Sequence, residues 1–423
     1  MGFLSFPKLH LLLIFTASIT SFNAESKTHW EDTEVLKQLK NSIDPSSLNP
    51  GSCLSSWDFT LDPCDNLFSE KFTCGFRCDA VESGTSRLTE LSLDQAGYSG
   101  SLAATTWNNL PYLDTVDISN NNFSGQIPES LSNLTRLRRL GLSRNSFTGE
   151  IPSSIGSLSN LEELYLDGNN LQGTIPGSFN GLKSLNRLEL QFNKLSGELP
   201  NLGSLKNLNY MDLSVNAITG ALPATLPESL VQISMRNNSL KGELASESFR
   251  NLRYLQVVDL SYNEFRGSVP FALFQLPSLQ QLSLSHNQFS FLQEPSSALD
   301  SLSSGLVEID LSNNELEGFL PLFMAVMPKL ASLSLENNRF SGMIPTQYAL
   351  KAVFPESGVS QFERLLLGGN FLFGGIPSAL MALEPGSANV GLAGNCLYRC
   401  PRVLFFCQGE DQKSFDECKR FIP

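Results

Sequence analysis

The segment Leu137–Gly149 reads LRRLGLSRNSFTG, which is one complete copy of the pattern L-x-x-L-x-L-x-x-N-x-L-x-G. The pattern recurs at Leu161–Gly173 and at Leu185–Gly197. Its asparagine position returns at intervals of mostly 22 to 25 residues, at 121, 145, 169, 193, 216, 238, 263, 287, 314, 338 and 370. An earlier copy begins at Leu88, so we count twelve copies. Tandem units of this length predict a solenoid that grows by stacking, rather than several compact domains.

Each copy predicts one short β-strand. The L-x-L core alternates with period two, so one face of the strand is buried. Stacked copies would pair these strands into a parallel sheet, with the leucines filling the interior. The asparagine side chain can satisfy backbone groups that are buried between adjacent turns. Twelve strands at a spacing of about 4.8 Å predict a ladder on the order of 50 Å long.

Many copies continue past the glycine with the sequence G-x-[IVL]-P, as at Gly125–Pro128, Gly149–Pro152 and Gly342–Pro345. This extension resembles the plant-type leucine-rich repeats of receptor-like proteins, receptor kinase ectodomains and polygalacturonase-inhibiting proteins. The resemblance covers about residues 30–400 and implies an α/β solenoid. In such a fold a right-handed superhelix carries a parallel concave sheet and has a disulfide cap at each end. The glycine-loop and catalytic-loop motifs of kinases are absent from the sequence, so the chain resembles such an ectodomain without kinase or membrane anchor.

The order of segments indicates a secreted protein. Residues 1–24 predict a signal peptide, because Lys8 precedes the apolar run 11–15 and small polar residues follow up to Ala24; an uncleaved anchor is the alternative. Residues 25–87 and 388–423 are expected to form the caps, and residues 88–387 the repeats. No later apolar run is long enough to span a bilayer, and no lipid-anchor signal ends the chain, so we expect no membrane insertion.

The eight cysteines fall into two groups of four, one in each cap: Cys53, Cys64, Cys74 and Cys78, then Cys396, Cys400, Cys407 and Cys418. An even number behind a signal peptide indicates disulfides, and each group allows three pairings. Zinc binding is the alternative for such short spacings. The first cap should also contain an amphipathic helix around 34–40. It departs from the related families in having the extra Cys53 and Cys74.

Charge, glycosylation motifs and insertions limit the range of partners. The formal net charge of −13, with no long basic run, argues against nucleic acid as a partner. We expect neither a cofactor nor a metal. Three sequons begin at Asn122, Asn133 and Asn237 and are candidate glycan sites, although such triplets also arise by chance. Extra sequence at 288–305 and 346–361 predicts loops, which are either functional or neutral insertions.

The concave face is the predicted binding surface. Its first column of outward residues reads Glu90, Thr115, Arg139, Glu163, Arg187, Tyr210, Gln232, Val257, Gln281, Glu308, Ser332 and Arg364. Aromatic and arginine side chains are typical interface anchors. The candidate ligand-binding residues are Arg139, Glu163, Tyr165, Arg187, Glu189, Phe192, Tyr210, Asp212, Tyr262 and His286. The alternative is structural: Arg139, Glu163 and Arg187 could form an ion-pair ladder, and the aromatics could cover their neighbours.

Catalysis is not expected. A Ser-His-Asp site would have to use His286, whose neighbouring serines recur because the repeat favours serine there. Glu189 and Asp212 occupy equivalent positions in adjacent coils, about 5 Å apart, which could mimic a glycosidase pair. A solenoid groove lacks the deep pocket that such chemistry needs.

The sequence therefore favours a non-enzymatic recognition protein that binds a peptide or protein ligand, or a membrane receptor kinase, on its concave face. An extended ligand could use the aromatic residues as anchors and an arginine for an acidic end. Two alternatives are an inhibitor of microbial wall-degrading enzymes and a structural protein of the cell wall.

Overall fold

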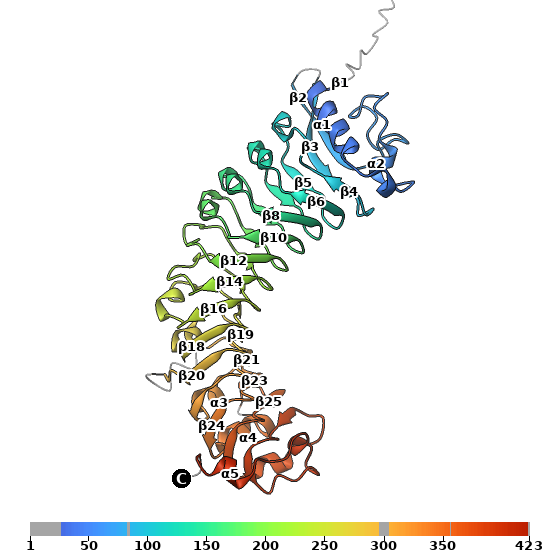
Figure 1. Ribbon diagram of the computed structural model, residues 1–423. Helices are drawn as coiled ribbons and strands as arrows, with labels where there is room; N and C mark the ends of the chain where they lie inside the picture. Colours follow the sequence, from blue (N-terminus) through green and yellow to red (C-terminus); the bar gives the residue numbers. More distant parts are fainter. Residues whose placement is uncertain (1–26, 83–84, 296–303, 356, 422–423) are drawn as a thin grey trace, which may run out of the picture.

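The computed structural model describes residues 27–82, 85–295, 304–355 and 357–421. The chain winds into a curved stack of coils with a compact cap at each end, as Figure 1 shows. The predicted signal peptide lies outside the described residues. Within those residues, no helix has both the length and the apolar character needed to cross a bilayer.

One continuous sheet lines the stack, with each strand parallel to the next from β3 onward. Its strands are β1 (Lys27–Thr28), β3 (Thr85–Ser92), β5 (Thr115–Asp117), β7 (Arg139–Gly141), β9 (Glu163–Tyr165), β11 (Arg187–Glu189), β13 (Tyr210–Asp212), β15 (Gln232–Ser234), β17 (Val257–Asp259), β19 (Gln281–Ser283), β21 (Glu308–Asp310), β23 (Ser332–Ser334), β25 (Arg364–Leu366) and β27 (Asn389–Gly391). The predicted first column is confirmed, because its residues face one another from Glu90↔Thr115 through Ser332↔Arg364. The antiparallel β2 (Phe76–Glu82) covers β3 at the N-terminal end.

The N-x-L-x-G half of each repeat forms a second, parallel ladder along the flank. Its longer sheet comprises β4 (Ser99–Ser101), β6 (Asn122–Gln126), β8 (Ser146–Glu150), β10 (Asn170–Gly173), β12 (Lys194–Glu198), β14 (Ala217–Gly220), β16 (Ser239–Gly242), β18 (Glu264–Val269) and β20 (Gln288–Leu292). The shorter sheet comprises β22 (Glu317–Phe319), β24 (Arg339–Gly342), β26 (Phe371–Gly375) and β28 (Cys396–Tyr398). The motif glycine adopts a left-handed backbone conformation that favours glycine: at Gly149 φ is +80°, and a Cβ there would also lie 3.0 Å from Gln126 of the preceding coil.

Short helical turns connect the two ladders along the outer side of the arc (Figure 1). They are η2 (Trp107–Asn109), η3 (Glu129–Asn133), η4 (Ser153–Ser157), η5 (Gly177–Gly181), η6 (Ser246–Ser248), η7 (Phe271–Gln275), α3 (Leu322–Val326), α4 (Thr346–Val353) and η9 (Ser378–Ala382). Paired strands lie only about 4.8 Å apart, whereas helical turns need a wider spacing. The outer side of the stack is therefore longer than the sheet side, and the stack bends toward the sheet.

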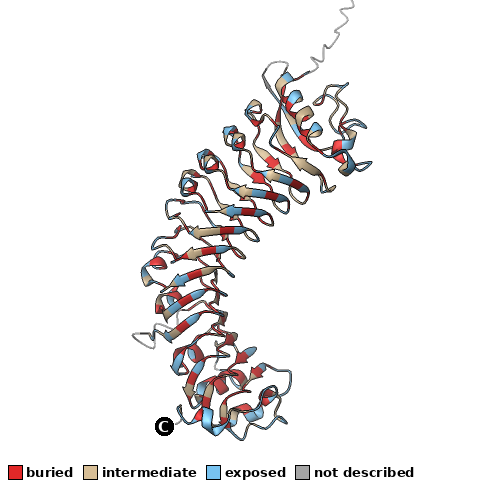
Figure 2. Cartoon of the chain, in the orientation of Figure 1, coloured by how far each residue is buried: buried red, intermediate tan, exposed pale blue. Residues whose placement is uncertain are grey.

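The interior is a single column of apolar side chains, with a ladder of asparagines at one side. Leu140, Leu142 and Phe147 are fully buried, and Figure 2 shows the same buried segment in every coil. In the ladder, Asn145 accepts from the Phe123 N–H at 2.9 Å and donates to two carbonyls. The predicted role of the asparagines in satisfying buried backbone groups is therefore confirmed.

The N-terminal cap contains the predicted helix, α1 (Trp30–Asn41), which buries Val35, Leu36 and Leu39. A buried carboxylate ties the helix to the first long strand: Asp32 accepts from Arg87 Nη2 at 2.8 Å and from the Leu88 N–H at 2.6 Å. The cap also contains η1 (Pro45–Ser47) and α2 (Cys53–Ser56).

All eight cysteines form disulfides, so no thiolate remains for the zinc alternative. In the first cap the two bonds interlace, Cys53–Cys74 and Cys64–Cys78. In the second cap they nest, with Cys400–Cys407 inside Cys396–Cys418. The second cap also contains η10 (Phe405–Cys407) and α5 (Phe415–Cys418).

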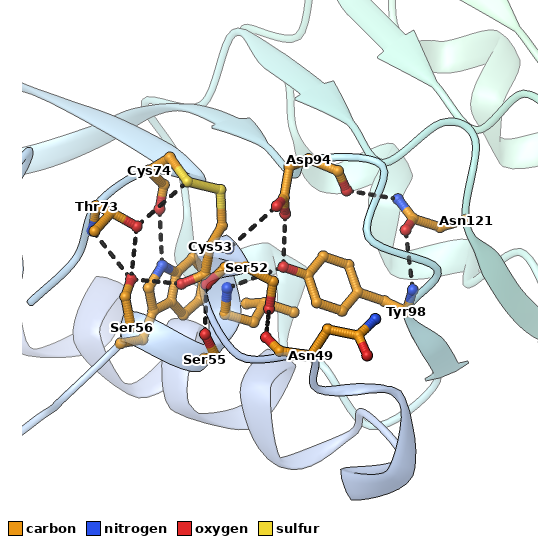
Figure 3. The surroundings of a disulfide bond; sticks show 12 residues. Asn49, Ser52, Cys53, Ser55, Ser56, Thr73, Cys74, Asp94, Tyr98 and Asn121 are labelled. Carbon is orange, nitrogen blue, oxygen red and sulfur yellow. Dashed lines mark hydrogen bonds between the residues drawn. A yellow bond between two sulfur atoms is a disulfide. The ribbon is translucent and has the colours of Figure 1, made fainter.

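The extra disulfide Cys53–Cys74 is joined to the repeat ladder through hydrogen bonds (Figure 3). Asp94 accepts from the Cys53 N–H at 3.2 Å and from the Tyr98 hydroxyl at 2.6 Å. Asn121, the first ladder asparagine, donates to the Asp94 carbonyl and accepts from the Tyr98 N–H. The cap and the first coils are thus one connected unit.

The segment expected to be a loop at 346–361 begins instead with helix α4, so that expectation was wrong for its first half. Tyr348 is fully buried in this helix, and its hydroxyl donates to the Pro321 carbonyl at 2.8 Å. The inserted sequence folds because it carries apolar residues at helical spacing, which cover α3. The segment 288–305 begins with strand β20, and its residues 296–303 lie outside the described residues.

Candidate ligand-binding surface

Seven of the ten predicted site residues lie on four adjacent strands, from β7 to β13. Arg139 lies opposite Glu163, Glu163 opposite Arg187, and Arg187 opposite Tyr210. In the second outward column, Tyr165 lies opposite Glu189. We name the set Arg139, Glu163, Tyr165, Arg187, Glu189 and Tyr210 the arginine–tyrosine cluster.

Arg139 is held on three sides. Its guanidinium pairs with Asp117 at 3.1 Å on one neighbouring strand and with Glu163 on the other. It also lies over the Tyr165 ring, 4.4 Å from the centroid, and the Tyr165 hydroxyl donates to Glu163 at 3.1 Å. These contacts form a closed polar network that orients the tyrosine.

The contacts of Arg187 differ from those that the predicted ion-pair ladder requires. Its Nε donates to Glu189 of its own strand at 2.6 Å, and its guanidinium lies 3.8 Å from the Tyr210 centroid. The Arg139–Glu163 step of the ladder is present, whereas the step to Arg187 is replaced by this local pair. Gln191 donates to the other Glu189 oxygen at 2.9 Å, and its own Oε1 is buried without a partner among the described residues.

Two carboxylates beside the cluster form no ion pair with a basic side chain of the described residues, although Arg144 lowers the pKa of one of them, Asp167, slightly. Asp167 is 8 % exposed and accepts from the Ser143 hydroxyl; Asp212 accepts from the Ser214 N–H at 2.9 Å. Burial, followed by repulsion from Glu189 among smaller effects, raises the pKa of both carboxyl groups. The concave surface here carries negative charge that the protein does not neutralise.

A hollow of about 430 Å³ opens over these strands. Its lining includes Asp117, Arg139, Tyr165, Asp167 and Glu189. This volume lies within the range of about 300–1,000 Å³ that ligand sites occupy. The floor of the hollow is polar and hydrogen-bonded, which suits a surface that orients an extended ligand.

The other three predicted residues lie on a second row, in the turn after the strand. Phe192, Tyr262 and His286 each precede the ladder asparagine and have positive φ, between +54° and +56°. The rings of Tyr262 and His286 stack with centroids 4.0 Å apart, and Arg236 lies 4.4 Å from the Tyr262 centroid. We name Arg236, Tyr262 and His286 the aromatic stack. Phe192 is 59 % exposed. The predicted binding residues therefore form two separate rows, one on the strands and one in the turns that follow them.

Four residues of these sites lie outside the predicted ligand-binding set: Asp117, Asp167, Gln191 and Arg236. Asp117 stands in the second outward column, two residues after Thr115, and tabulating that column would have found it. Gly141 also indicates that Asp117 needs space, because a Cβ at this facing position would lie only 2.8 Å from Asp117 Cγ. The other three lie one or two positions beyond the strand, where the pattern alone does not indicate contact.

The arrangement does not favour the catalytic alternatives. No hydrogen bond joins the His286 side chain to a serine or an aspartate within the described residues; its ring stacks on Tyr262. Glu189 and Asp212 do face each other, but Arg187 and Gln191 occupy the oxygens of Glu189.

The three sequon asparagines Asn122, Asn133 and Asn237 are exposed. Asn122 begins β6, Asn133 ends η3, and Asn237 occupies the turn position next to Tyr262 in the neighbouring coil. Their glycosylation stays a prediction.

The fold and the comparison with known families agree. The family described as "Leucine-rich repeat region" matches residues 93–377. The chain therefore belongs to the leucine-rich-repeat family.

Among curated proteins, two relatives come from Arabidopsis thaliana. Receptor-like protein 7 is 34 % identical over 157 residues, covering 37 % of this chain and 15 % of its own length. Pollen receptor-like kinase 2 is 31 % identical over 172 residues, covering 39 % of this chain and 24 % of its own length. The chain thus matches less than a quarter of the length of either relative.

Solved structures resemble the chain over a larger share. The plant peptide hormone receptor RGFR1, in complex with RGF2, has a TM-score of 0.66 and 29 % identity, over 73 % of this chain and 48 % of that one. The ectodomain of the Arabidopsis receptor kinase HAESA, bound to an IDA peptide hormone, has a TM-score of 0.53 and 27 % identity, over 75 % and 60 %. The predicted resemblance to plant receptor ectodomains is confirmed.

Proposed function

We propose that this protein is an extracellular recognition module that binds a peptide or protein ligand on the concave strands β7 to β13. The observation that carries the proposal is the arginine–tyrosine cluster, in which two tyrosines are held in place by two arginines. Rigid aromatic side chains with satisfied polar neighbours are the usual anchors of interfaces. The peptide-bound receptor structures support this ligand class. Four disulfides suit an oxidising, extracellular compartment.

The charges favour a ligand with a basic side chain at this site. Both cluster arginines are already paired with carboxylates, so neither is available for an acidic group of the ligand. Asp212 has no ion-pair partner among the described residues, Asp167 has only Arg144 acting on it at longer range, and burial raises the pKa of both carboxyl groups. A lysine or arginine of the ligand would supply a positive charge beside these carboxylates and offset the free-energy cost of keeping them ionised while buried.

The test is affinity purification from the extracellular fluid of the source tissue, with mass spectrometry of what is recovered. Wild type is compared with the double variant Tyr165→Ala, Tyr210→Ala. The matched control is Tyr254→Ala, since Tyr254 is 64 % exposed and lies outside the cluster. We expect recovery of one or more partners to fall at least tenfold in the double variant and to stay unchanged in the control. Equal recovery with all three proteins would rule out this surface.

Binding, rather than catalysis, is what the geometry supports. No specific contact in the structure favours the alternatives of an inhibitor of wall-degrading enzymes or a structural wall protein.

A further inference from the structure

A second hollow, of about 480 Å³, lies on the outer side of the solenoid, away from the concave sheet. It is bounded by η5 on one side and η6 on the other, and by the connections that precede β13 and β15. Its lining is mostly polar and includes Asn180, Asn201, Ser204, Thr225 and Asn251. None of them belongs to the concave surface described above.

The hollow exists because two consecutive coils are short. The ladder asparagines are 24 residues apart up to Asn193, but the next two steps, to Asn216 and Asn238, are 23 and 22 residues. In these two coils the outer connection is an extended loop, whereas the flanking coils have the helical turns η5 and η6. The shortened loops leave a depression between the two turns.

The side chains around the hollow are fixed in place by mutual hydrogen bonds. Asn201 Oδ1 accepts from the Thr225 hydroxyl and from the Gly203 N–H, both at 2.9 Å. Asn180 donates to the Asn201 carbonyl at 2.6 Å and accepts from the Ser204 hydroxyl at 2.6 Å. These bonds cross three coils and hold the amide groups in one orientation before any ligand binds.

Several polar groups remain available after these bonds are made. Within the described residues, the Asn201 amide N–H groups, Lys206 and Glu247 have no hydrogen-bond or ion-pair partner, and Asn251 uses only one bond, to Glu228 at 3.2 Å. The buried Ser248, 4 % exposed, lines the hollow, and its Oγ also lacks a partner. Such groups normally find a partner, in protein, water or ligand.

The chemistry of the lining points to a polyhydroxylated ligand. Amide and carboxylate side chains each offer two adjacent polar atoms, and together with hydroxyls they match neighbouring sugar hydroxyls that both donate and accept. Lys206 lies among Glu228 and Glu247, so no net positive charge favours an acidic polymer. The exposed Ala224 in the lining adds a small apolar surface for the C–H face of a sugar ring.

We propose that this outer hollow is a binding site for a neutral oligosaccharide. The proposal does not depend on the concave surface, because the two sites share no residue. A protein with both sites would hold a glycan on its outer side while its concave side stays free for another partner.

The test is calorimetric and saturation-transfer NMR titration of the full chain with three neutral hexasaccharides, of β-1,4-linked glucose, mannose and xylose. The charged probe is hexagalacturonate. We expect at least one neutral probe to bind, and its Kd to rise tenfold or more in the double variant Asn201→Ala, Thr225→Val. Asn251→Ala is the second variant, since it removes one side chain that bonds only to Glu228; a threefold or larger weakening is expected.

The matched control is Asn160→Ala, because Asn160 is also an exposed asparagine on an outer connection and donates only to the Thr135 carbonyl at 2.8 Å. It should bind the probe as wild type does, and circular dichroism checks that every variant is folded. Three results would overturn the proposal: no neutral probe binds wild type, hexagalacturonate binds more tightly than all of them, or Asn251→Ala and the double variant bind like the control.

Discussion

Two regions of the solenoid carry the same contact, an arginine guanidinium over a tyrosine ring, in opposite electrostatic surroundings. In the arginine–tyrosine cluster, Arg139 lies 4.4 Å from the Tyr165 centroid and pairs with Asp117 and Glu163. In the aromatic stack, Arg236 lies 4.4 Å from the Tyr262 centroid and donates to the Ser261 hydroxyl at 3.2 Å, with no carboxylate partner among the described residues.

The difference shows that a sequence motif does not determine the charge of a site. The cluster arginines neutralise the carboxylates that they pair with and hold the tyrosine rings in position. They add no free positive charge, so the surface around them stays acidic. Arg236 keeps its charge available at the edge of the stack, so an anion is better suited to that place. Both regions rest on the same asparagine ladder, which allows the scaffold and the sites to be tested separately.

The largest effect should come from the shared ladder. Asn169→Leu leaves the Phe147 N–H without a partner, and Asn263→Leu does the same to the Leu240 N–H. The carbonyls of Leu142, Leu166, Met235 and Leu260 each keep a donor from the adjacent ladder asparagine. An unsatisfied buried N–H costs about 1–3 kcal/mol, so we expect each variant to lose about 2 kcal/mol in urea unfolding. The exposed neighbour Asn170→Leu is the control and should unfold near wild type. If the two ladder variants differ by more than about 1.5 kcal/mol, the two regions do not share an equivalent scaffold.

A smaller effect should separate the two arginines. Arg139→Met leaves Asp117 and Glu163 near each other without a cation, and we expect a loss of about 1 kcal/mol, since the network is partly exposed to solvent. Arg236→Met removes no ion pair and should unfold within error of wild type. The measurement is urea unfolding at low and high salt, where screening should reduce only the Arg139 effect. Equal losses for both variants would contradict the comparison.

The smallest effect should be a pH dependence beside the cluster. The folded-state pKa of Asp212 is raised above its ordinary 3.8, chiefly by burial. The folded protein therefore holds more protons than the unfolded chain just above pH 3.8, and stability declines as pH rises through that window. Asp212→Asn should lack this decline, so its stability relative to wild type should increase between pH 4 and pH 7. Ser234→Ala, at the facing position of β15, has no titrating group and should follow wild type. A variant curve parallel to that of wild type would show that Asp212 does not carry uncompensated charge.

Much of the fold follows from the repeat pattern itself. The spacing of leucines, glycines and asparagines specifies the strands, the facing columns and the asparagine ladder. Each repeat packs against an almost identical neighbour, so equivalent positions of adjacent repeats lie opposite each other. For this reason the first outward column of the concave face, from Glu90 to Arg364, could be aligned across twelve coils. The helix of the first cap was also predictable, since Val35, Leu36 and Leu39 have helical spacing.

Other features depend on which side chains of different coils come together. The disulfide pairings, the choice of Asp117 and Glu189 as arginine partners, the split of the aromatic residues into two rows, and helix α4 were decided only by tertiary structure. Each of these involves side-chain direction or local coil width, which vary while the repeat pattern stays the same. The sequence by itself determined that this protein is a stack of leucine-rich coils with an exposed concave face. Tertiary packing decided where that face is acidic, and it opened a polar hollow on the outer side, because two slightly shortened coils lie between two full ones.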